Sequence, residues 1–122
     1  MTYHIGNYKN DAPKHRGWFI GTFIEDGAAK TEDVEVKYWE FPIGPTTHDT
    51  KVSATYECTI FIAGRTRGTI DGKEYEFKAG DYIAIQPGIP SNPVMEILEP
   101  TIGLTIKAPS DPNAKQVIGA SV

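Results

Sequence analysis

The stretch Thr55–Gly88 reads TYECTIFIAGRTRGTIDGKEYEFKAGDYIAIQPG and decides the fold. It is rich in β-branched and aromatic residues, which favour extended backbone. Asp71-Gly72 suits a type I′ hairpin turn, because both of its positions need a positive φ. Pro87-Gly88 forms a second, rigid turn at the end of the stretch. The pattern predicts strands at 55–63, 66–70, 73–77 and 82–85.

Strand patterns continue on both sides of this stretch. Upstream they lie at 17–24 and 34–38, and downstream at 94–98 and 101–107. About eight short strands with turn residues between them are typical of an all-β sandwich or barrel. We therefore expect one domain over residues 1–122: a core at about 17–107, an N-terminal arm at 1–16 and a C-terminal surface tail at 108–122.

Charge and composition exclude several classes of protein. The net charge of -4 argues against nucleic-acid binding, which needs clustered Lys and Arg. Cys58 is the only cysteine, so no internal disulfide forms, which is typical of a reducing compartment. No apolar run has the length of a membrane span or a signal peptide. We expect a cytoplasmic protein with no membrane partner.

The strand predicted at 56–63 is apolar on both faces. Tyr56, Cys58, Ile60 and Ile62 share one face, while the other carries Glu57, Thr59, Phe61 and Ala63. An antiparallel sheet normally leaves one face in contact with water. Something is therefore expected to cover the second face, either the N-terminal arm or a second subunit. We favour a homodimer, since exposed apolar area of this kind usually marks an interface.

The central stretch resembles the cupin superfamily, whose members are small jelly-roll barrels, also called double-stranded β-helices. One cupin motif is a Gly, five residues, a Pro, one residue, a Gly, two residues and a His. Its positions here are Gly80, Gln86, Gly88 and Ser91, so both glycines are kept while the Pro and the His are replaced. The segment 17–21, GWFIG, is also similar to small bacterial cupins of unassigned activity. The resemblance implies the fold and no particular reaction.

The second cupin motif implies a metal site that this chain does not complete. Glu57 and Gly64 match its Glu and Gly, but its two His positions fall within TKVS at 50–53. The resemblance implies three His and one Glu as ligands, and a partial set holds a divalent ion poorly. The ligand spacing does not support a divalent metal, so we predict no cofactor. The chain has three histidines: His4, His15 and His48.

Two residues are candidates for catalysis. Glu57 is predicted to point into the barrel and act as an acid or base; the alternative is a structural Glu bonded to Arg65, Arg67 or a Thr hydroxyl. His48 follows a Pro-Gly loop and is predicted at the barrel mouth as a base or hydrogen-bonding group. Its alternative is a solvated loop histidine.

Five further residues are predicted to bind a ligand. Aromatic walls with a few polar groups suit a small organic molecule, although plain core packing is the alternative for the aromatic residues. The arginine in this set suits a carboxylate or phosphate, and its alternative is a solvated strand edge. The predicted ligand-binding residues are Tyr38, Trp39, Arg65, Tyr82 and Ser91.

Three functions follow from these patterns. The first is a metal-free cupin-type barrel that binds a small molecule around Glu57 and the aromatic residues. The second is a cupin-type enzyme, either a metal-dependent oxygenase or isomerase using Glu57 with His48, or a metal-free epimerase-like acid–base catalyst. The third is a structural or interaction domain whose barrel is filled by its own side chains.

Overall fold

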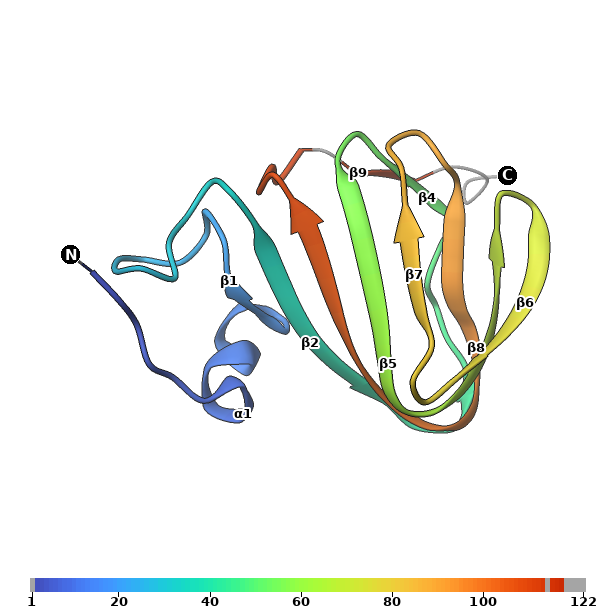
Figure 1. Cartoon of the computed structure of the whole chain (residues 1–122). Helices are drawn as coiled ribbons and strands as arrows, with labels where there is room; N and C mark the ends of the chain where they lie inside the picture. The colour runs from blue at the N-terminus through green and yellow to red at the C-terminus, as the bar shows by residue number, and fades with distance from the viewer. Residues whose placement is uncertain (1, 114, 118–122) are drawn as a thin grey trace.

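Figure 1 shows a computed structural model of the chain, which describes residues 2–113 and 115–117. Within these residues, nine strands form one hydrogen-bonded sheet that curves into an open barrel, with two short helices at the N-terminus. In chain order the elements are α1 (Tyr8–Asp11), the 3-10 helix η1 (Ala12–His15), β1 (Trp18–Ile20), β2 (Glu35–Phe41), β3 (Gly44–Pro45), β4 (Lys51–Ser53), β5 (Tyr56–Ile70), β6 (Lys73–Lys78), β7 (Tyr82–Ile85), β8 (Ser91–Ala108) and β9 (Lys115–Val117).

Two long strands replace four of the predicted short ones. Segments 55–63 and 66–70 merge into β5, and segments 94–98 and 101–107 merge into β8. The two strands bend where they cross, and their register shifts on both sides of Gly64. Gly64 has φ +89°, and a Cβ there would lie 2.2 Å from the Pro100 carbonyl oxygen. The sequence pattern predicts strand ends at these positions, but the chain bends there and its hydrogen-bonded pairing continues.

The bends give the barrel two walls. In one wall, the first half of β5 lies between β7 and the second half of β8, and β8 pairs in turn with β2. In the other, the second half of β5 pairs with β6 and with the first half of β8, which also pairs with β3 and β4. Figure 1 shows the walls joined at the bends of β5 and β8. The predicted all-β jelly-roll barrel is confirmed.

Aromatic residues fill the barrel near these bends. Phe61 is buried, with its ring 5.9 Å from Trp39 and stacked 5.0 Å from Phe77. Gly103 lies opposite both Phe61 and Trp39 in the ladders, and a Cβ there would lie 2.2 Å from the Trp39 ring. The absence of a side chain at 103 is what lets the indole pack across β8. The apolar core thus occupies this end and leaves the other end to polar side chains.

The two ends of the chain are more ordered than predicted. The arm at 1–16 contains α1 and η1, and the Tyr8 ring packs 4.4 Å from that of Tyr38 on β2. The first strand stops at Ile20 instead of 24, because Gly21 turns the chain and bonds to Ala29 and Thr31. The predicted surface tail contains β9, which pairs with β4. The rest of that prediction at 114 and 118–122 lies outside the described residues.

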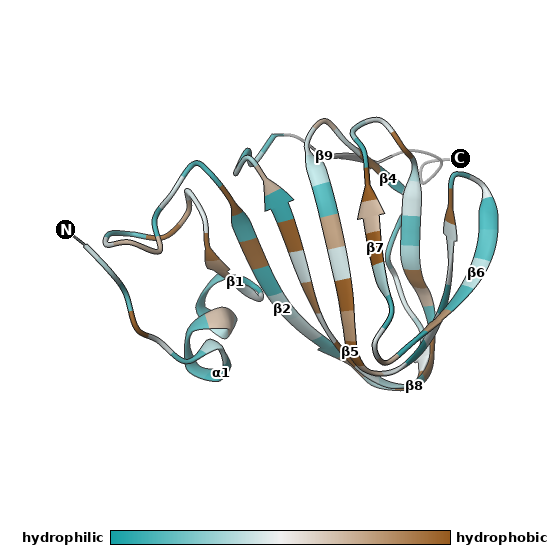
Figure 2. Cartoon of the chain, in the orientation of Figure 1, coloured by the Kyte–Doolittle hydropathy of each residue, from teal (hydrophilic) through white to brown (hydrophobic). Residues whose placement is uncertain are grey.

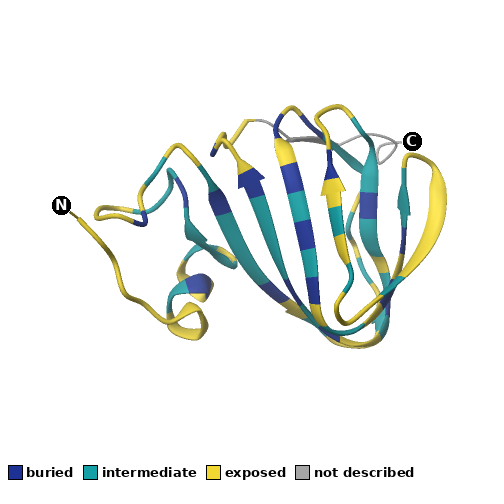
Figure 3. Cartoon of the chain, viewed as in Figure 1, coloured by how far each residue is buried: buried dark blue, intermediate teal, exposed yellow. Residues whose placement is uncertain are grey.

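The alternation predicted for the central strand is confirmed. Glu57, Thr59 and Phe61 are buried inside the barrel, whereas Ile62 on the other face is 50% exposed. Figures 2 and 3 show this alternation of hydropathy and burial along β5. The arm packs on β2 at the side of this wall, through Tyr8. It therefore does not cover the outer face of β5, and the second subunit expected there stays a prediction.

Candidate functional site

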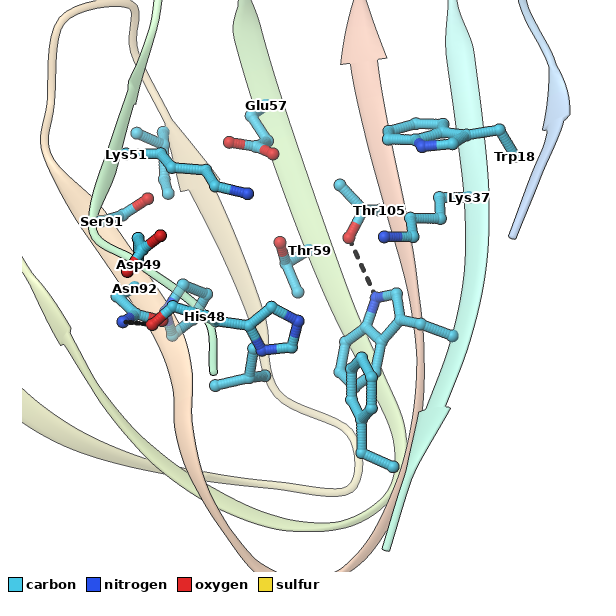
Figure 4. A pocket seen from close by; sticks show the side chains of 15 residues that line it. Trp18, Lys37, His48, Asp49, Lys51, Glu57, Thr59, Ser91, Asn92 and Thr105 are labelled. Atoms are coloured by element: carbon cyan, nitrogen blue, oxygen red, sulfur yellow. Dashed lines mark hydrogen bonds between the residues drawn. The ribbon is translucent and has the colours of Figure 1, made fainter. Parts of the chain in front are cut away.

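A cavity of about 110 Å³ lies between the walls, and charged, hydroxyl and aromatic side chains line it. Its lining comes from β1, β2, β4, β5, β7, β8 and the loop before β4. Figure 4 shows side chains from both walls directed toward one another across it. The cavity is partly open to solvent.

One wall carries a row of charges across three neighbouring strands. Glu57 on β5, Lys107 on β8 and Glu35 on β2 are direct partners in the two ladders. All three are buried, and Lys107 Nζ lies 3.3 Å from Glu35 Oε2. Ser110 Oγ donates to Glu35 Oε1 at 3.0 Å, which further satisfies this carboxylate. Buried charges are tolerated when paired and hydrogen-bonded in this way.

The next row of the same wall supplies hydroxyl groups and an amine. Thr59, Thr105 and Lys37 are partners across β5, β8 and β2. The Thr105 hydroxyl accepts a 3.0 Å hydrogen bond from Trp39 Nε1, which fixes the indole at the border between cavity and core. Trp18 closes this side, with Lys37 Nζ 5.6 Å and Lys107 Nζ 4.8 Å from its ring centroid.

The opposite wall contributes a second amine and an imidazole. Lys51 on β4 is the ladder partner of Ser91 on β8, and both line the cavity. His48 lies in the loop before β4, where its backbone oxygen accepts a 2.9 Å hydrogen bond from the buried Asn92 side chain. The Phe41 ring lies edge-on to the imidazole, 4.9 Å away. Figure 4 shows His48 and Lys51 facing Thr59 and Glu57.

The structure brings together four of the seven predicted site residues. Glu57, His48, Trp39 and Ser91 line the cavity, and their roles stay predictions. The remaining three residues do not line the cavity. Each of them either points to the outer face of its strand or lies in another part of the barrel. They are Tyr38, Arg65 and Tyr82.

These three residues have other surroundings. The Tyr38 hydroxyl donates to Glu40 at 2.6 Å, and this hydrogen bond raises the Tyr38 pKa to about 12. Arg65 forms ion pairs with Glu76 and Glu99 on the exposed hairpin side. Tyr82 is 72% exposed on the outside of the barrel.

Both arginines considered in the structural alternative for Glu57 pair with other carboxylates, and a bond to a Thr hydroxyl stays the alternative. Arg65 and Arg67 form their ion pairs with glutamates of β6 and β8. The cation opposite Glu57 is Lys107, which lies 50 residues away in sequence and reaches this position only through the β5–β8 register.

Several lining residues were not predicted. Lys51 lies within the TKVS segment that replaces the cupin histidines, and this position was a usable signal. Lys37 alternates with apolar residues in a half-buried strand, where a lysine is usually solvated. The pattern therefore did not indicate that Lys37 lines the cavity. The missed lining residues include Trp18, Lys37, Asp49, Lys51, Thr59 and Asn92.

The donor set does not fit a divalent metal. Lys51 and Ser91 lie in the segments where the cupin motifs have histidines, and an ammonium group repels a cation. Within residues 2–113 and 115–117, no three His, Cys, Asp or Glu side chains are grouped so as to hold a metal ion.

Solved structures share this architecture. No protein-family model matches the chain, and no curated protein matches it. An uncharacterised conserved protein with a double-stranded β-helix domain from Klebsiella pneumoniae is similar, at 24% identity and a TM-score of 0.60, over 71% of this chain and 76% of that one. An RmlC-like cupin family protein from Methanocaldococcus jannaschii is similar at 21% identity and a TM-score of 0.56, over 66% of this chain and 73% of that one.

The chain has the cupin fold. A DMSP lyase from Ruegeria pomeroyi shares it at 14% identity and a TM-score of 0.62, over 75% of this chain and 46% of that enzyme. Cupin-fold neighbours thus include both uncharacterised proteins and an enzyme, and likeness at these identities carries the fold alone. No helix among the described residues is long and apolar enough to cross a membrane.

Proposed function

We propose that this cupin-fold chain binds a small hydroxy acid in the barrel cavity, through its side chains and without a metal. The observation that carries the proposal is that Lys37 and Lys51, on opposite walls, line one cavity with the buried carboxylate of Glu57. Ammonium groups bind a ligand carboxylate, and a carboxylate accepts a hydrogen bond from a ligand hydroxyl. A ligand with both groups matches both kinds of partner.

Size and charge narrow the ligand further. A cavity of about 110 Å³ has room for roughly four waters at their liquid volume, which suits an acid of lactate size. A ligand ammonium would meet the lysines already lining the cavity, so a hydroxyl is the better donor toward Glu57. The cavity also favours ligand binding over a barrel filled by its own side chains.

The test is titration of untagged, metal-free protein with L-lactate, followed by amide NMR shifts. Lys51→Met is expected to weaken lactate binding by about 10- to 100-fold, since a charged hydrogen bond is worth about 1.5–3 kcal/mol. Glu57→Gln should weaken lactate more than propionate, which lacks the hydroxyl. Lys73→Met, in the exposed β5–β6 hairpin, is the control and should change neither affinity.

Two results would overturn this proposal. One is an absence of lactate-induced shifts at the cavity residues up to high millimolar concentration. The other is stoichiometric Fe, Mn, Zn or Ni in protein purified without an affinity tag, with lactate binding lost when the metal is removed.

A second candidate function is epimerase-like acid–base catalysis on the same kind of ligand. Glu57 and His48 line one cavity from opposite walls, so one group can remove the proton next to the ligand carboxylate while the other returns a proton to the opposite face. Exchange of this hydrogen in D₂O, with appearance of D-lactate, would support catalysis. The exchange should disappear in Glu57→Gln and His48→Ala. If no hydrogen exchange is observed, the catalytic proposal fails and the binding function remains.

A further inference from the structure

A second hollow lies beside the cavity, between the N-terminal arm and β2. Its volume is about 640 Å³, and we call it the arm groove. One side is formed by α1, η1 and the turn after them, and the other by the part of β2 beyond its pairing with β1. Figure 1 shows the two short helices beside β2. Its lining includes Tyr8, Lys9, Arg16, Tyr38 and Phe41.

The arm groove adjoins the barrel cavity. Lys37, Trp39, Phe41 and His48 line both hollows, so these side chains form the border between them. A molecule that occupies one hollow therefore contacts residues of the other. The cavity alone is smaller than the 300–1,000 Å³ usual for ligand sites, whereas the arm groove falls within that range.

An aromatic ring fits the arm groove and not the cavity. An apolar cavity of about 150 Å³ binds benzene, and the barrel cavity, at about 110 Å³, is smaller and has charged side chains in its lining. The arm groove has aromatic walls, with the rings of Tyr8 and Tyr38 4.4 Å apart. Lys9 and Arg16 add cations that interact well with the face of a ring.

A turn with two positive φ angles lies beside the groove. Arg16 has φ 56°, a left-handed conformation uncommon for a residue other than glycine. Gly17 follows with φ +103°, and a Cβ there would lie 2.5 Å from the Tyr38 carbonyl oxygen. Tyr38 N donates to the Gly17 oxygen at 2.9 Å. The turn is thus pressed onto β2 beside the groove, and strain of this kind clusters at binding sites.

We infer that the ligand has two parts: a hydroxy-acid head in the barrel cavity and an aromatic ring in the arm groove. The inference rests on the proposed function and adds the class of compound, an aryl-substituted hydroxy acid. The ring lies against Tyr8 and Tyr38, with Arg16 and Lys9 beside it. Lys37 and Trp39 border both parts of the ligand.

The test compares probes that differ in the ring alone. L-Lactate supplies the head, and mandelate and L-3-phenyllactate add a ring at increasing distance from it. We expect the better of the two aryl acids to bind about tenfold tighter than lactate by calorimetry. 3-Phenyllactamide, which keeps the ring and loses the charge, should bind more weakly than 3-phenyllactate.

Variants locate the ring. Tyr8→Ala and Arg16→Gly should remove most of the gain from the ring and leave lactate affinity unchanged. Glycine relieves the strained φ at 16, so Arg16→Gly should keep or raise the melting temperature, which separates lost binding from lost folding. Lys14→Met is the control, because Lys14 is exposed on η1 and does not line the groove.

The outcomes separate the two proposals. Lactate binding with no gain from any ring overturns the two-part ligand and leaves the proposed function standing. If the ring still raises the affinity in both Tyr8→Ala and Arg16→Gly, the ring binds elsewhere, and the two-part ligand is overturned as well. If lactate and every aryl acid fail to bind, the proposed function fails together with this inference.

Discussion

The wall formed by β7, β5, β8 and β2 has charged residues on its inner face and apolar residues on its outer face. A barrel usually has the reverse, with apolar residues inside and polar residues outside. The inner face, toward one end, carries Glu57, Lys107 and Glu35 in a single row. The outer face of the same strands carries apolar side chains, among them Ile62 at 50% exposure and Tyr82 at 72%. Figure 2 shows both kinds of residue alternating along the same strands. Polar groups that converge on an internal cavity are typical of a binding site, and exposed apolar area is typical of an interface.

The largest effect is expected from breaking the inner row of charges. Lys107→Met leaves Glu35 buried without its ion pair, and removing one partner of a buried pair costs about 3–5 kcal/mol. Urea unfolding measures this loss of stability. Replacing both partners, with Lys107→Met and Glu35→Leu together, should recover much of it. A single variant as stable as the wild type would show that the row is not a buried network.

The outer face is expected to hold a second copy of the chain. Light scattering should give about twice the 13.4 kDa of one chain. Ile62→Lys places a charge in the centre of the apolar face and should weaken the dimer at least tenfold, about 1.4 kcal/mol. Met95→Lys is the matched control, because Met95 is 43% exposed on the other wall. A monomeric wild type would contradict the expectation.

The smallest effect concerns Cys58, which lies on the outer face of β5. Burial raises the pKa of its thiol, so less of the reactive thiolate is present at neutral pH. Iodoacetamide should alkylate Cys58 at pH 8 more slowly than in unfolded protein, with the rate rising as the pH is raised further. Ile62→Lys should speed the reaction a few-fold if a partner covers the outer face. Equal rates in folded and unfolded protein would contradict the burial.

Much of the fold could be predicted from local pattern. The alternation over 56–63 placed Glu57 inside the barrel, and Asp71-Gly72 marked the hairpin between β5 and β6. The missed continuity of β5 and β8 has a clear cause. Gly64 and Pro100 are turn residues in the sequence, but in the fold they face each other where two strands bend together. Rules that consider only neighbouring residues treat the glycine and the proline separately, and therefore predict the end of a strand at each of them.

The candidate site divides in the same way. Trp39 and Glu57 were identified because they stand out in short windows, an indole and a carboxylate among strand residues. Tyr38 was included with Trp39 as an aromatic residue of the cavity wall, yet a single step along a strand turns a side chain to the opposite face. Lys37 was missed because a lysine that alternates with apolar residues usually faces water, and only the closing of the barrel placed it inside.

The sequence by itself determined the strands, the hairpin and the alternation that separates a polar from an apolar face, because these depend on the preferences of neighbouring residues. The tertiary structure alone decided which charges meet. Lys107 lies opposite Glu57 and Glu35 through strand register, and Lys51 lies across the cavity on the other wall. Contacts between residues far apart in the chain depend on how the sheet bends and closes. That geometry gives the stretch at Thr55–Gly88 a cavity with charged side chains on one side and exposed apolar residues on the other.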